Sequence, residues 1–392
     1  MPHDQEVPVS NVTAAPDDRP PVVFLAGGGS GGHIFPNIAI ANRLAELGLT
    51  IEPFFMVSQR PLDARILKQA NQDFAPLPVK PFSSNPLKMF SFYSAYRKSV
   101  YVARELIKRR SAKAVVATGG FAAAPVVDAA RREGVDTVLV NLDAVPGKAN
   151  RIVARHATKT FTVYESPILD NAQLIGLPLR RVALGPDDQG DARAQLGLDP
   201  DLFTLLAVGG SQGAQSINLT MLNLAGREAV QHALHEWQIL HICGPAHTKI
   251  VTQTYKQLND AGASLRIKVV GFCDTMGLAW RSANLAISRA GANGVGEAWA
   301  NVAPTIFLPY PMHRDQHQRH NARPMVATGG AIMLTDLTDP ARNAHAMEDT
   351  LIGLLTDRPQ LATMSDKLGQ ARPTDGAVEV AQWLVARLCG QQ

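Results

Sequence analysis

Two glycine-rich turns are the residues of this sequence that point most directly to chemistry. The first, LAGGGSGGHIFP at 25–36, follows an apolar run and carries Gly27, Gly29 and Gly32 at the spacing G-x-G-x-x-G. The second, GGSQGA at 209–214, follows another apolar run. A glycine turn between a parallel strand and a helix exposes backbone N–H groups at the positive end of the helix dipole. Both turns therefore favour phosphate binding, with a tight packing turn as the alternative.

The surroundings of the first turn disfavour a dinucleotide cofactor. NAD requires an acid about 20 residues further on, at the carboxyl end of the second strand. That strand ends in MVSQR at 56–60, and Glu52 lies at its start, on the wrong edge of the sheet. We expect no cofactor, and an NAD(P)-dependent oxidoreductase stays as a competing hypothesis.

The segment 287–322 contains the densest group of polar residues. Ser288 to Gly291 end a predicted strand, and Ala292 to Glu297 form the first turn of a predicted helix. The N–H groups of that turn would face a diphosphate, and Glu297 would accept hydrogen bonds from the vicinal hydroxyls of a ribose. The competing interpretations are a surface carboxylate matched to the helix dipole for Glu297, and a plain ion pair for Arg289.

Beyond the next predicted strand, TIFLP, lies a polar tail suited to sugar hydroxyls. Its candidate side chains are His313, Asp315, His317, Gln318 and Asn321. A histidine-rich metal site is the rival. We expect no metal, because the imidazoles are mixed with amides and the spacing of a helical histidine–carboxylate site is absent.

The composition bounds the class of protein. The chain has 392 residues, 46% hydrophobic and 18% charged, which is typical of a globular protein with two domains. A net charge of +4 gives no indication of a nucleic-acid partner, but suits anionic ligands or an anionic membrane surface. The three cysteines form no metal motif, which favours a reducing compartment. No apolar run approaches the length of a membrane-spanning helix.

Apolar strand-like runs alternate with helical patterns in two successive blocks, which indicates an α/β fold with two doubly wound parallel sheets. We predict a disordered tail over 1–20, an N-terminal Rossmann-like domain over 21–182 and a linker over 183–200. A C-terminal Rossmann-like domain follows over 201–372, and a helix over 373–392 packs back on the N-terminal domain. The literal D-x-D at 199–201 lies between a turn-rich stretch and a strand, and we interpret it as a turn and not as a manganese site.

Taken together, residues 21–385 resemble the MurG family, the bacterial UDP-N-acetylglucosamine:lipid I N-acetylglucosaminyltransferases of peptidoglycan synthesis. The closer matches are GGSGGHIFP, GGSQGA, SRAGA, Glu297, Pro304 and DQHQRHNA, and the looser ones are GGFAAAP, AVPGKANR and GLPLR. The resemblance implies the GT-B architecture, in which two Rossmann-like domains face a cleft that holds the active site.

The resemblance also implies an activity. N-acetylglucosamine would pass with inversion from UDP-GlcNAc to the muramoyl sugar of undecaprenyl-pyrophosphate-linked lipid I, forming lipid II. The enzyme would be peripheral, on the cytoplasmic face of the bacterial inner membrane, without a nucleic-acid partner. The residues implied to bind UDP-GlcNAc are Ser30, Gly31, Gly32, Asp143, Arg180, Ser211, Cys273, Arg289, Ala292, Asn293, Gly294, Val295, Gly296, Glu297, His317 and Gln318. The candidate catalytic bases are His33 and Asp143; we favour His33, whose alternative is a helix-start histidine bonded to nearby backbone.

Three departures from the family pattern bear on the acceptor. The family usually has His-Glu-Gln-Asn where residues 140–143 read VNLD, so that Asp143 places a carboxylate where an amide is usual. Gly294 occupies a position where the family often has a threonine, and Leu177 one where an asparagine is usual. Two alternatives therefore stay open: a GT-B enzyme that transfers a UDP-sugar to another glycolipid or small-molecule acceptor, and a non-catalytic sugar-nucleotide-binding relative.

Residues 87–110 predict a helix with an apolar stripe and a basic collar. The stripe is Met89, Phe92, Tyr93, Tyr96, Val100 and Ala103, and the collar is Lys88, Arg97, Lys98, Arg104, Lys108, Arg109 and Arg110. Such a helix can lie on anionic lipid. The competing interpretation is a core helix with a solvated basic face.

Overall fold

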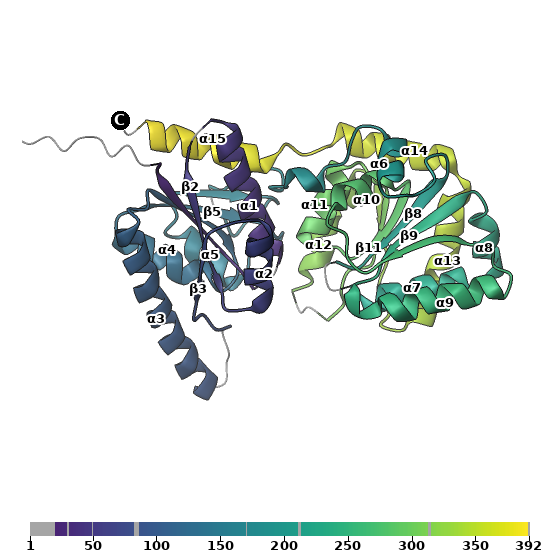
Figure 1. Cartoon of the computed structure of the whole chain (residues 1–392), viewed down its shortest axis with the longest axis horizontal. Coiled ribbons are helices and arrows are strands. Elements are labelled where there is room, and N and C mark those ends of the chain that lie inside the picture. Colours follow the sequence, from purple (N-terminus) through teal and green to yellow (C-terminus); the bar gives the residue numbers. More distant parts are fainter. Residues whose placement is uncertain are drawn as a thin grey trace, which may run out of the picture.

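The computed structural model describes residues 20–390 except 30, 49, 82–85, 170, 211, 212, 313 and 314. Its two parallel sheets lie side by side, each between layers of helices (Figure 1). The sheet of the N-terminal half has the order β3-β2-β1-β4-β5-β6-β7. Its strands are β1 (Val22–Gly27), β2 (Glu52–Ser58), β3 (Phe74–Leu77), β4 (Ala114–Gly119), β5 (Asp136–Asn141), β6 (Lys159–Thr162) and β7 (Gln173–Leu174).

The sheet of the C-terminal half has the order β10-β9-β8-β11-β12-β13. Its strands are β8 (Phe203–Val208), β9 (Trp237–Ile242), β10 (Arg266–Val270), β11 (Leu285–Ser288), β12 (Thr305–Phe307) and β13 (Ala331–Met333). Every strand pair in both sheets is parallel. The predicted pair of doubly wound sheets is confirmed.

Helices cover both faces of each sheet. In the N-terminal half they are α1 (Gly31–Glu46), α2 (Pro61–Gln69), α3 (Pro86–Arg109), α4 (Ala123–Arg132) and α5 (Lys148–Ala154). The C-terminal half follows with α6 (Gln189–Gln195), α7 (Gln215–Ala225), α8 (Glu228–Ala233), α9 (Thr248–Asp260), α10 (Met276–Ser282), α11 (Ala292–Ala300), α12 (His317–Ala327), α13 (Pro340–Thr356) and α14 (Arg358–Gln370). Two short 3-10 helices, Arg181–Ala183 and Pro245–His247, precede α6 and α9. The last helix is α15 (Gly376–Cys389).

The strands form because their apolar runs are buried on both faces, as parallel sheets require. All six residues of β1 and all six of β4 are buried. In the N-terminal half, α1 and α15 cover one face of the sheet, whereas α3 and α4 cover the other. In the C-terminal half, α7, α9 and α13 cover one face, and α10, α11 and α12 the other.

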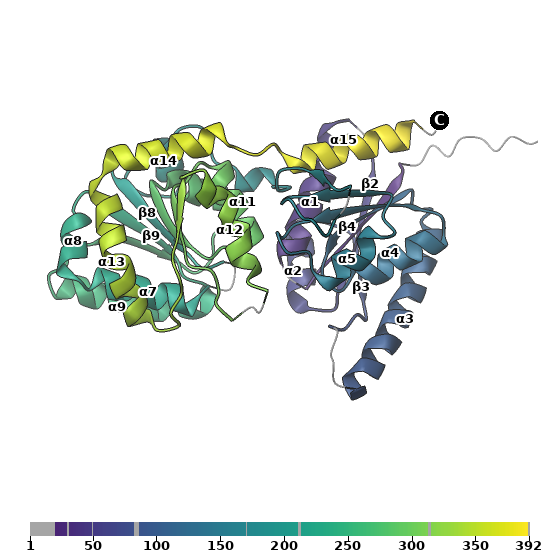
Figure 2. The same ribbon diagram turned by 180° about the vertical axis from the view of Figure 1, so that it is seen from behind.

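The chain crosses between the halves twice, and α15 packs against α1 of the N-terminal half (Figures 1 and 2). The crossings touch backbone to backbone, since a Cβ at Gly176 would lie 1.7 Å from the Thr374 carbonyl oxygen. A buried arginine secures the return: Arg43 Nε donates to Asp375 Oδ2 at 2.9 Å, and its Nη2 to the Leu179 carbonyl at 3.3 Å. These contacts hold the two crossing segments together at the junction of the halves.

Several predicted elements agree with the structure, and others were missed. Runs such as 114–120, 136–142 and 237–244 contain strands, and the last helix is present. The short edge strands β3, β7 and β13 had no clear sequence signal. Residues 199–201 form the predicted turn, in which the Asp201 N–H donates to Asp199 Oδ1 at 3.0 Å. The predicted domain limits stay a prediction, and the tail over 1–20 lies outside the described residues except for its last residue.

The topology places the site. Strand order reverses between β1 and β4 in one sheet and between β8 and β11 in the other. Ligands of open parallel sheets bind beyond the carboxyl ends of the strands at such a switch point. Ligands are therefore expected at the turns after β1, β4 and β11.

Candidate active site

A buried carboxylate, that of Asp63, accepts a hydrogen bond from the first glycine turn. Asp63 Oδ2 accepts from the Gly29 N–H at 2.8 Å and from Ser58 Oγ at 2.5 Å, and the side chain is fully buried. The Gly29 N–H is therefore engaged within the protein. The N–H groups of Gly31 and Gly32, in the first turn of α1, have no carbonyl partner from the helix itself and are the ones that suit an anion. Ser30 lies outside the described residues.

His33 stands in the same first turn, against the turn that follows β4. Thr118 Oγ1 donates to the His33 carbonyl at 2.6 Å and so joins the start of α1 to the end of β4. Gly120 has a φ of +75°, and a Cβ there would lie 2.4 Å from the Gly28 carbonyl oxygen and 3.4 Å from His33 Nδ1. Only glycine fits this approach.

Burial lowers the pKa of His33 from its ordinary value of 6.5, against the opposing effect of the Asp143 and Asp63 carboxylates. The imidazole is consequently neutral near pH 7. A neutral imidazole has a nitrogen lone pair that can accept a proton, which a general base requires.

Asp143 lies at the boundary of the two halves and is bonded across it. Its Oδ1 accepts from Asn321 Nδ2 at 3.0 Å, and Asn321 Oδ1 accepts from the Ala144 N–H at 2.9 Å. Asn321 belongs to α12 and is fully buried. One amide side chain thus closes two hydrogen bonds between the C-terminal half and the loop after β5.

The N-terminal turn of α11 has no side-chain cap. The residue before it, Gly291, offers no side chain as a cap. The first N–H groups, those of residues 292–294, therefore have no partner within the helix. Beside them, Asn293 Oδ1 is buried without a hydrogen-bond partner among the described residues. Buried polar atoms are nearly always bonded, so both features indicate a polar ligand at this turn.

Glu297, one turn further along α11, is held by a tryptophan. Its Oε2 accepts from Trp280 Nε1 of α10 at 3.0 Å, and the Trp280 side chain is 1% exposed. Burial raises the pKa of Glu297 to about 7, although the Trp280 hydrogen bond and the Arg180 charge lower it. The carboxyl group therefore changes its charge near neutral pH.

Arg180 lies between the halves, near Glu297. Its guanidinium stacks on the Phe35 ring of α1 at 3.9 Å from the ring centre. Burial lowers the pKa of Arg180, opposed by the charges of Glu297 and Asp274. This cation is positioned beside the α11 turn, where an anionic ligand would meet it.

Arg289 forms an ion pair, the alternative considered for it from the sequence, and its contact with the donor stays a prediction. Its Nη1 donates to Asp336 Oδ2 at 2.6 Å and to the Leu308 carbonyl at 2.8 Å. Burial alone would raise the pKa of Asp336, but hydrogen bonds from Asn343, Ser216, the Thr338 N–H and Arg289 hold it below its ordinary value. The ion pair ties the loop before α11 to the loop after β13, and Ser216 Oγ, at the start of α7, donates to the same Asp336 carboxylate at 2.8 Å. In this structure Arg289 stabilises the loop that precedes α11.

The remaining predicted residues line the same side of the C-terminal half. Cys273 is half-buried in the loop before α10, with its Sγ 3.7 Å from Thr275 Oγ1. Gln318 Oε1 accepts from the Tyr310 N–H at 2.8 Å, and His317 Nδ1 lies 2.9 Å from Asp315 Oδ1. Ser211 and His313 lie outside the described residues. Within the described ranges no three of His, Cys, Asp and Glu gather to hold a metal ion, and the absence of a metal requirement stays a prediction.

Comparisons with known proteins identify the family. Residues 23–162 match the glycosyltransferase family 28 N-terminal domain, and residues 204–380 match the glycosyltransferase family 28 C-terminal domain. The UDP-N-acetylglucosamine--N-acetylmuramyl-(pentapeptide) pyrophosphoryl-undecaprenol N-acetylglucosamine transferase of Leifsonia xyli is 36% identical over 91% of this chain and 96% of its own. The protein of the same name from Clavibacter sepedonicus is 37% identical over 92% and 95%. The chain belongs to the MurG family.

A solved MurG structure supports the same assignment. The crystal structure of Acinetobacter baumannii MurG is 25% identical, has a TM-score of 0.72 and is matched over 98% of its length, with 92% of this chain covered. A putative UDP-N-acetylglucosamine 2-epimerase from Listeria monocytogenes, 13% identical with a TM-score of 0.65, shares the fold alone; the match covers 95% of this chain and 98% of the epimerase. The GT-B architecture and the family resemblance predicted from the MurG motifs are confirmed.

The structure brings two pairs of predicted residues together. His33 lies within the electrostatic reach of Asp143, and Arg180 within that of Glu297, whereas Arg289 is paired with Asp336. Sequence reasoning missed the residues that hold the site, namely Trp280, Asp63, Asp336 and Phe35. Each acts through a contact distant in sequence. Phe35 lies within the motif GGSGGHIFP but had no role assigned to it, and no motif marked the other three.

Proposed function

We propose that this chain transfers N-acetylglucosamine from UDP-GlcNAc to the muramoyl sugar of undecaprenyl-pyrophosphate-linked lipid I, forming lipid II for peptidoglycan synthesis. One observation carries the proposal: the chain aligns with nearly the whole length of relatives named for this reaction, at 36% identity to the Leifsonia protein over 96% of its length. The site geometry supplies what each substrate requires.

The donor binds at the start of α11. The N–H groups of residues 292–294 and the Arg180 guanidinium hold the diphosphate, and Glu297 accepts hydrogen bonds from the ribose hydroxyls. The backbone at Cys273 pairs with the uracil edge, and Gln318 and His317 bind hydroxyls of the sugar. Gly31 and Gly32 face the diphosphate of the donor or the pyrophosphate of the acceptor from the other half.

The reaction is an inverting displacement. A hydroxyl of the muramoyl sugar attacks the anomeric carbon from the side opposite to UDP, and His33 accepts its proton. Negative charge grows on the departing diphosphate, where preorganised N–H groups and Arg180 stabilise it. We favour His33 over Asp143 as the base, because Asp143 already accepts a hydrogen bond from Asn321 and its charge acts on His33 from nearby.

We also propose that the protein attaches peripherally to the cytoplasmic face of the bacterial inner membrane through α3. Val100 and Ala103 of the predicted stripe are buried in the core, so the core interpretation holds for that part of the helix. Phe90, Tyr93 and Tyr101, however, are 79%, 57% and 65% exposed.

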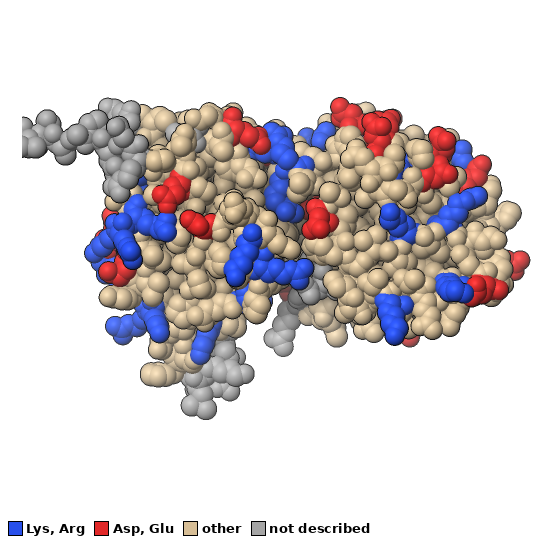
Figure 3. Space-filling model, in the orientation of Figure 1, with Lys and Arg blue, Asp and Glu red and all other residues tan. Residues whose placement is uncertain are grey.

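Phe90 and Tyr101 lie close to three helical turns apart and so share a face, which we call the α3 face. Its exposed basic neighbours include Arg97 and Lys98. Figure 3 shows Lys and Arg side chains around the N-terminal half, from which α3 projects in Figure 1. An aromatic face with basic neighbours suits an anionic lipid surface. Among the helices that the structure describes, none has the length and apolar content needed to span a membrane.

The activity is tested by transfer of radiolabelled sugar from UDP-GlcNAc to a soluble lipid I analogue. We expect the wild-type chain to form the disaccharide product. Glu297→Gln should raise the donor KM about tenfold, because a charged hydrogen-bond acceptor for the ribose is lost. Glu228→Gln, an exposed carboxylate of α8, serves as the matched control and should behave as wild type. No product with this acceptor, but transfer to another glycolipid, would refute the proposed acceptor.

The base is tested by the pH dependence of kcat at saturating substrates. His33 must be unprotonated to act, and its pKa lies below 6.5, so kcat should be constant near pH 7 and fall only below pH 6.5. Asp143→Asn removes a charge that raises the pKa of His33, and should move this fall to lower pH. His33→Ala should reduce kcat by about 10² to 10⁴ and abolish the fall. Turnover of His33→Ala within a few-fold of wild type would remove His33 from the mechanism.

Membrane attachment is tested by sedimentation with liposomes that contain an anionic lipid. We expect binding that weakens with salt and with the double substitution Phe90→Ser and Tyr93→Ser, because both the apolar contact and the charge attraction are reduced. Ile250→Ser, which removes a 55% exposed apolar residue from α9, is the control. Equal sedimentation with neutral and anionic liposomes would contradict an attachment through the α3 face.

A further inference from the structure

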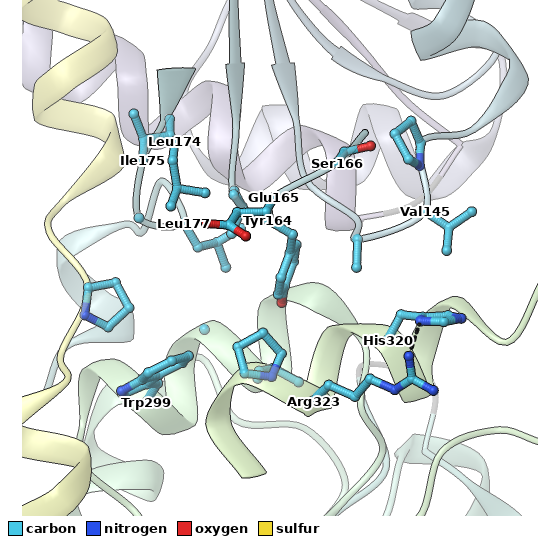
Figure 4. A pocket seen from close by; sticks show the side chains of 18 of the residues that line it. Val145, Tyr164, Glu165, Ser166, Leu174, Ile175, Leu177, Trp299, His320 and Arg323 are labelled. Atoms are coloured by element: carbon cyan, nitrogen blue, oxygen red, sulfur yellow. Dashed lines mark hydrogen bonds between the residues drawn. The ribbon is translucent and has the colours of Figure 1, made fainter. Parts of the chain in front are cut away.

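A pocket lies between the two halves, beside the proposed reaction centre. It has a volume of about 750 Å³, and Ala144, the residue after Asp143, is part of its lining. The loops after β5 and β6 and the strand β7 line it from the N-terminal half, and one face each of α11 and α12 from the C-terminal half (Figure 4). A volume of this size is typical of a pocket that holds a small ligand.

The walls of this pocket are apolar with a few polar groups. Leu174 and Ile168 both line the pocket from the N-terminal half and are 53% and 48% exposed, so that each leaves apolar surface uncovered by the protein. Glu165 and Ser166 lie on the same wall and offer oxygen atoms to N–H donors.

The opposite wall carries a cation. Arg323 of α12 lines the pocket, and its Nη1 lies 3.2 Å from His320 Nδ1. Figure 4 shows the two side chains next to one another on this wall, and Tyr164 pointing from the N-terminal half toward the same wall. Within the described parts of the chain, Arg323 forms no ion pair with a carboxylate. Its guanidinium keeps donors for a planar anion such as a carboxylate.

The chemistry of the proposed acceptor places a peptide at this position. A muramyl residue joined to pyrophosphate through C1 carries its peptide on a lactyl ether at C3, and its free hydroxyls are at C4 and C6. The reacting hydroxyl is therefore on the same ring as the origin of the peptide. With that hydroxyl at His33 and Asp143, the peptide starts beside Ala144, the next residue of the chain, which lines the pocket.

We propose that this pocket binds the peptide arm of the acceptor: the apolar wall takes its aliphatic side chains, and Arg323 its terminal carboxylate. The inference rests on the proposed function and extends it, because it assigns the acceptor's peptide to residues on both halves. Arg323 and Leu174 are then specificity-determining residues that touch only the peptide. Their loss affects the binding of peptide-bearing acceptors and leaves the chemistry of the sugar unchanged.

The experiment compares two soluble acceptors that share the muramyl-pyrophosphoryl group. One bears the full pentapeptide and the other only a lactyl amide. For the wild-type chain we expect a KM for the pentapeptide acceptor at least about tenfold below that for the peptide-free acceptor, as one charge-assisted hydrogen bond and some apolar burial provide. Arg323→Gln should raise the first KM about tenfold and change the second less than about twofold, with kcat unaltered.

Two further variants complete the test. Leu174→Asp places a repelling charge on the exposed edge strand β7 and should weaken only the pentapeptide acceptor. Arg319→Gln, on the same helix as Arg323 but outside the pocket, should leave both KM values unchanged. Retained affinity for UDP shows that each variant is folded.

The outcomes separate the two claims. Equal KM values for the two acceptors in the wild-type chain, or equal effects of Arg323→Gln on both, overturn the peptide pocket and leave the transferase proposal standing. Absence of transfer to either acceptor overturns the transferase proposal, and the peptide pocket with it.

Discussion

The first turn of α11 carries backbone N–H groups that no carbonyl of its own helix can satisfy, and the rest of the cleft is arranged around that fact. A helix start of this kind attracts negative charge wherever it occurs, and a parallel sheet brings it to the carboxyl edge of the strands. Here the Asp336–Arg289 ion pair braces the loop before it, and Trp280 holds the carboxylate of Glu297 one turn further on. The backbone N–H groups thus give the site its preference for anions, and the side chains around them modify that preference.

The second constraint is that two separate sheets must present their edges to one another. A few contacts across the boundary accomplish this: the amide of Asn321 bonded to Asp143 and Ala144, the charge interaction of Arg180 with Glu297, and the close backbone crossing at Gly176. The first two involve groups to which we assign substrates. Substrate binding would therefore compete with, or replace, the contacts that join the halves. This arrangement is suited to a cleft that changes its opening as ligands enter and leave.

The sequence predicted what depends on local pattern. Glycine turns after apolar runs, the SRAGA segment and the alternation of strands with helices are local signals, and they located both halves and the α11 turn. The supports of the site depend on tertiary contacts. Asp63 reaches the Gly29 N–H from another helix, and Trp280 meets Glu297 from the preceding helix, without any shared period. For Arg289 the sequence left a ligand contact and an ion pair open. Its ion-pair partner in this structure, Asp336, is distant along the chain, so no local pattern could have named it.

The central claim is that a uridine nucleotide binds at the start of α11 through an ionised Glu297. Calorimetric measurement of UDP affinity against pH tests it most directly, with Glu297→Gln titrated in parallel to remove the contribution of the phosphate's own ionisation. Because the pKa of Glu297 is raised to about 7 and only the ionised form accepts two hydrogen bonds from the ribose, the wild-type affinity should increase with pH. Between about pH 6 and about pH 8 we expect a rise about tenfold larger than in the variant. Parallel profiles for the two proteins, or UDP bound with equal affinity by both, would contradict the account.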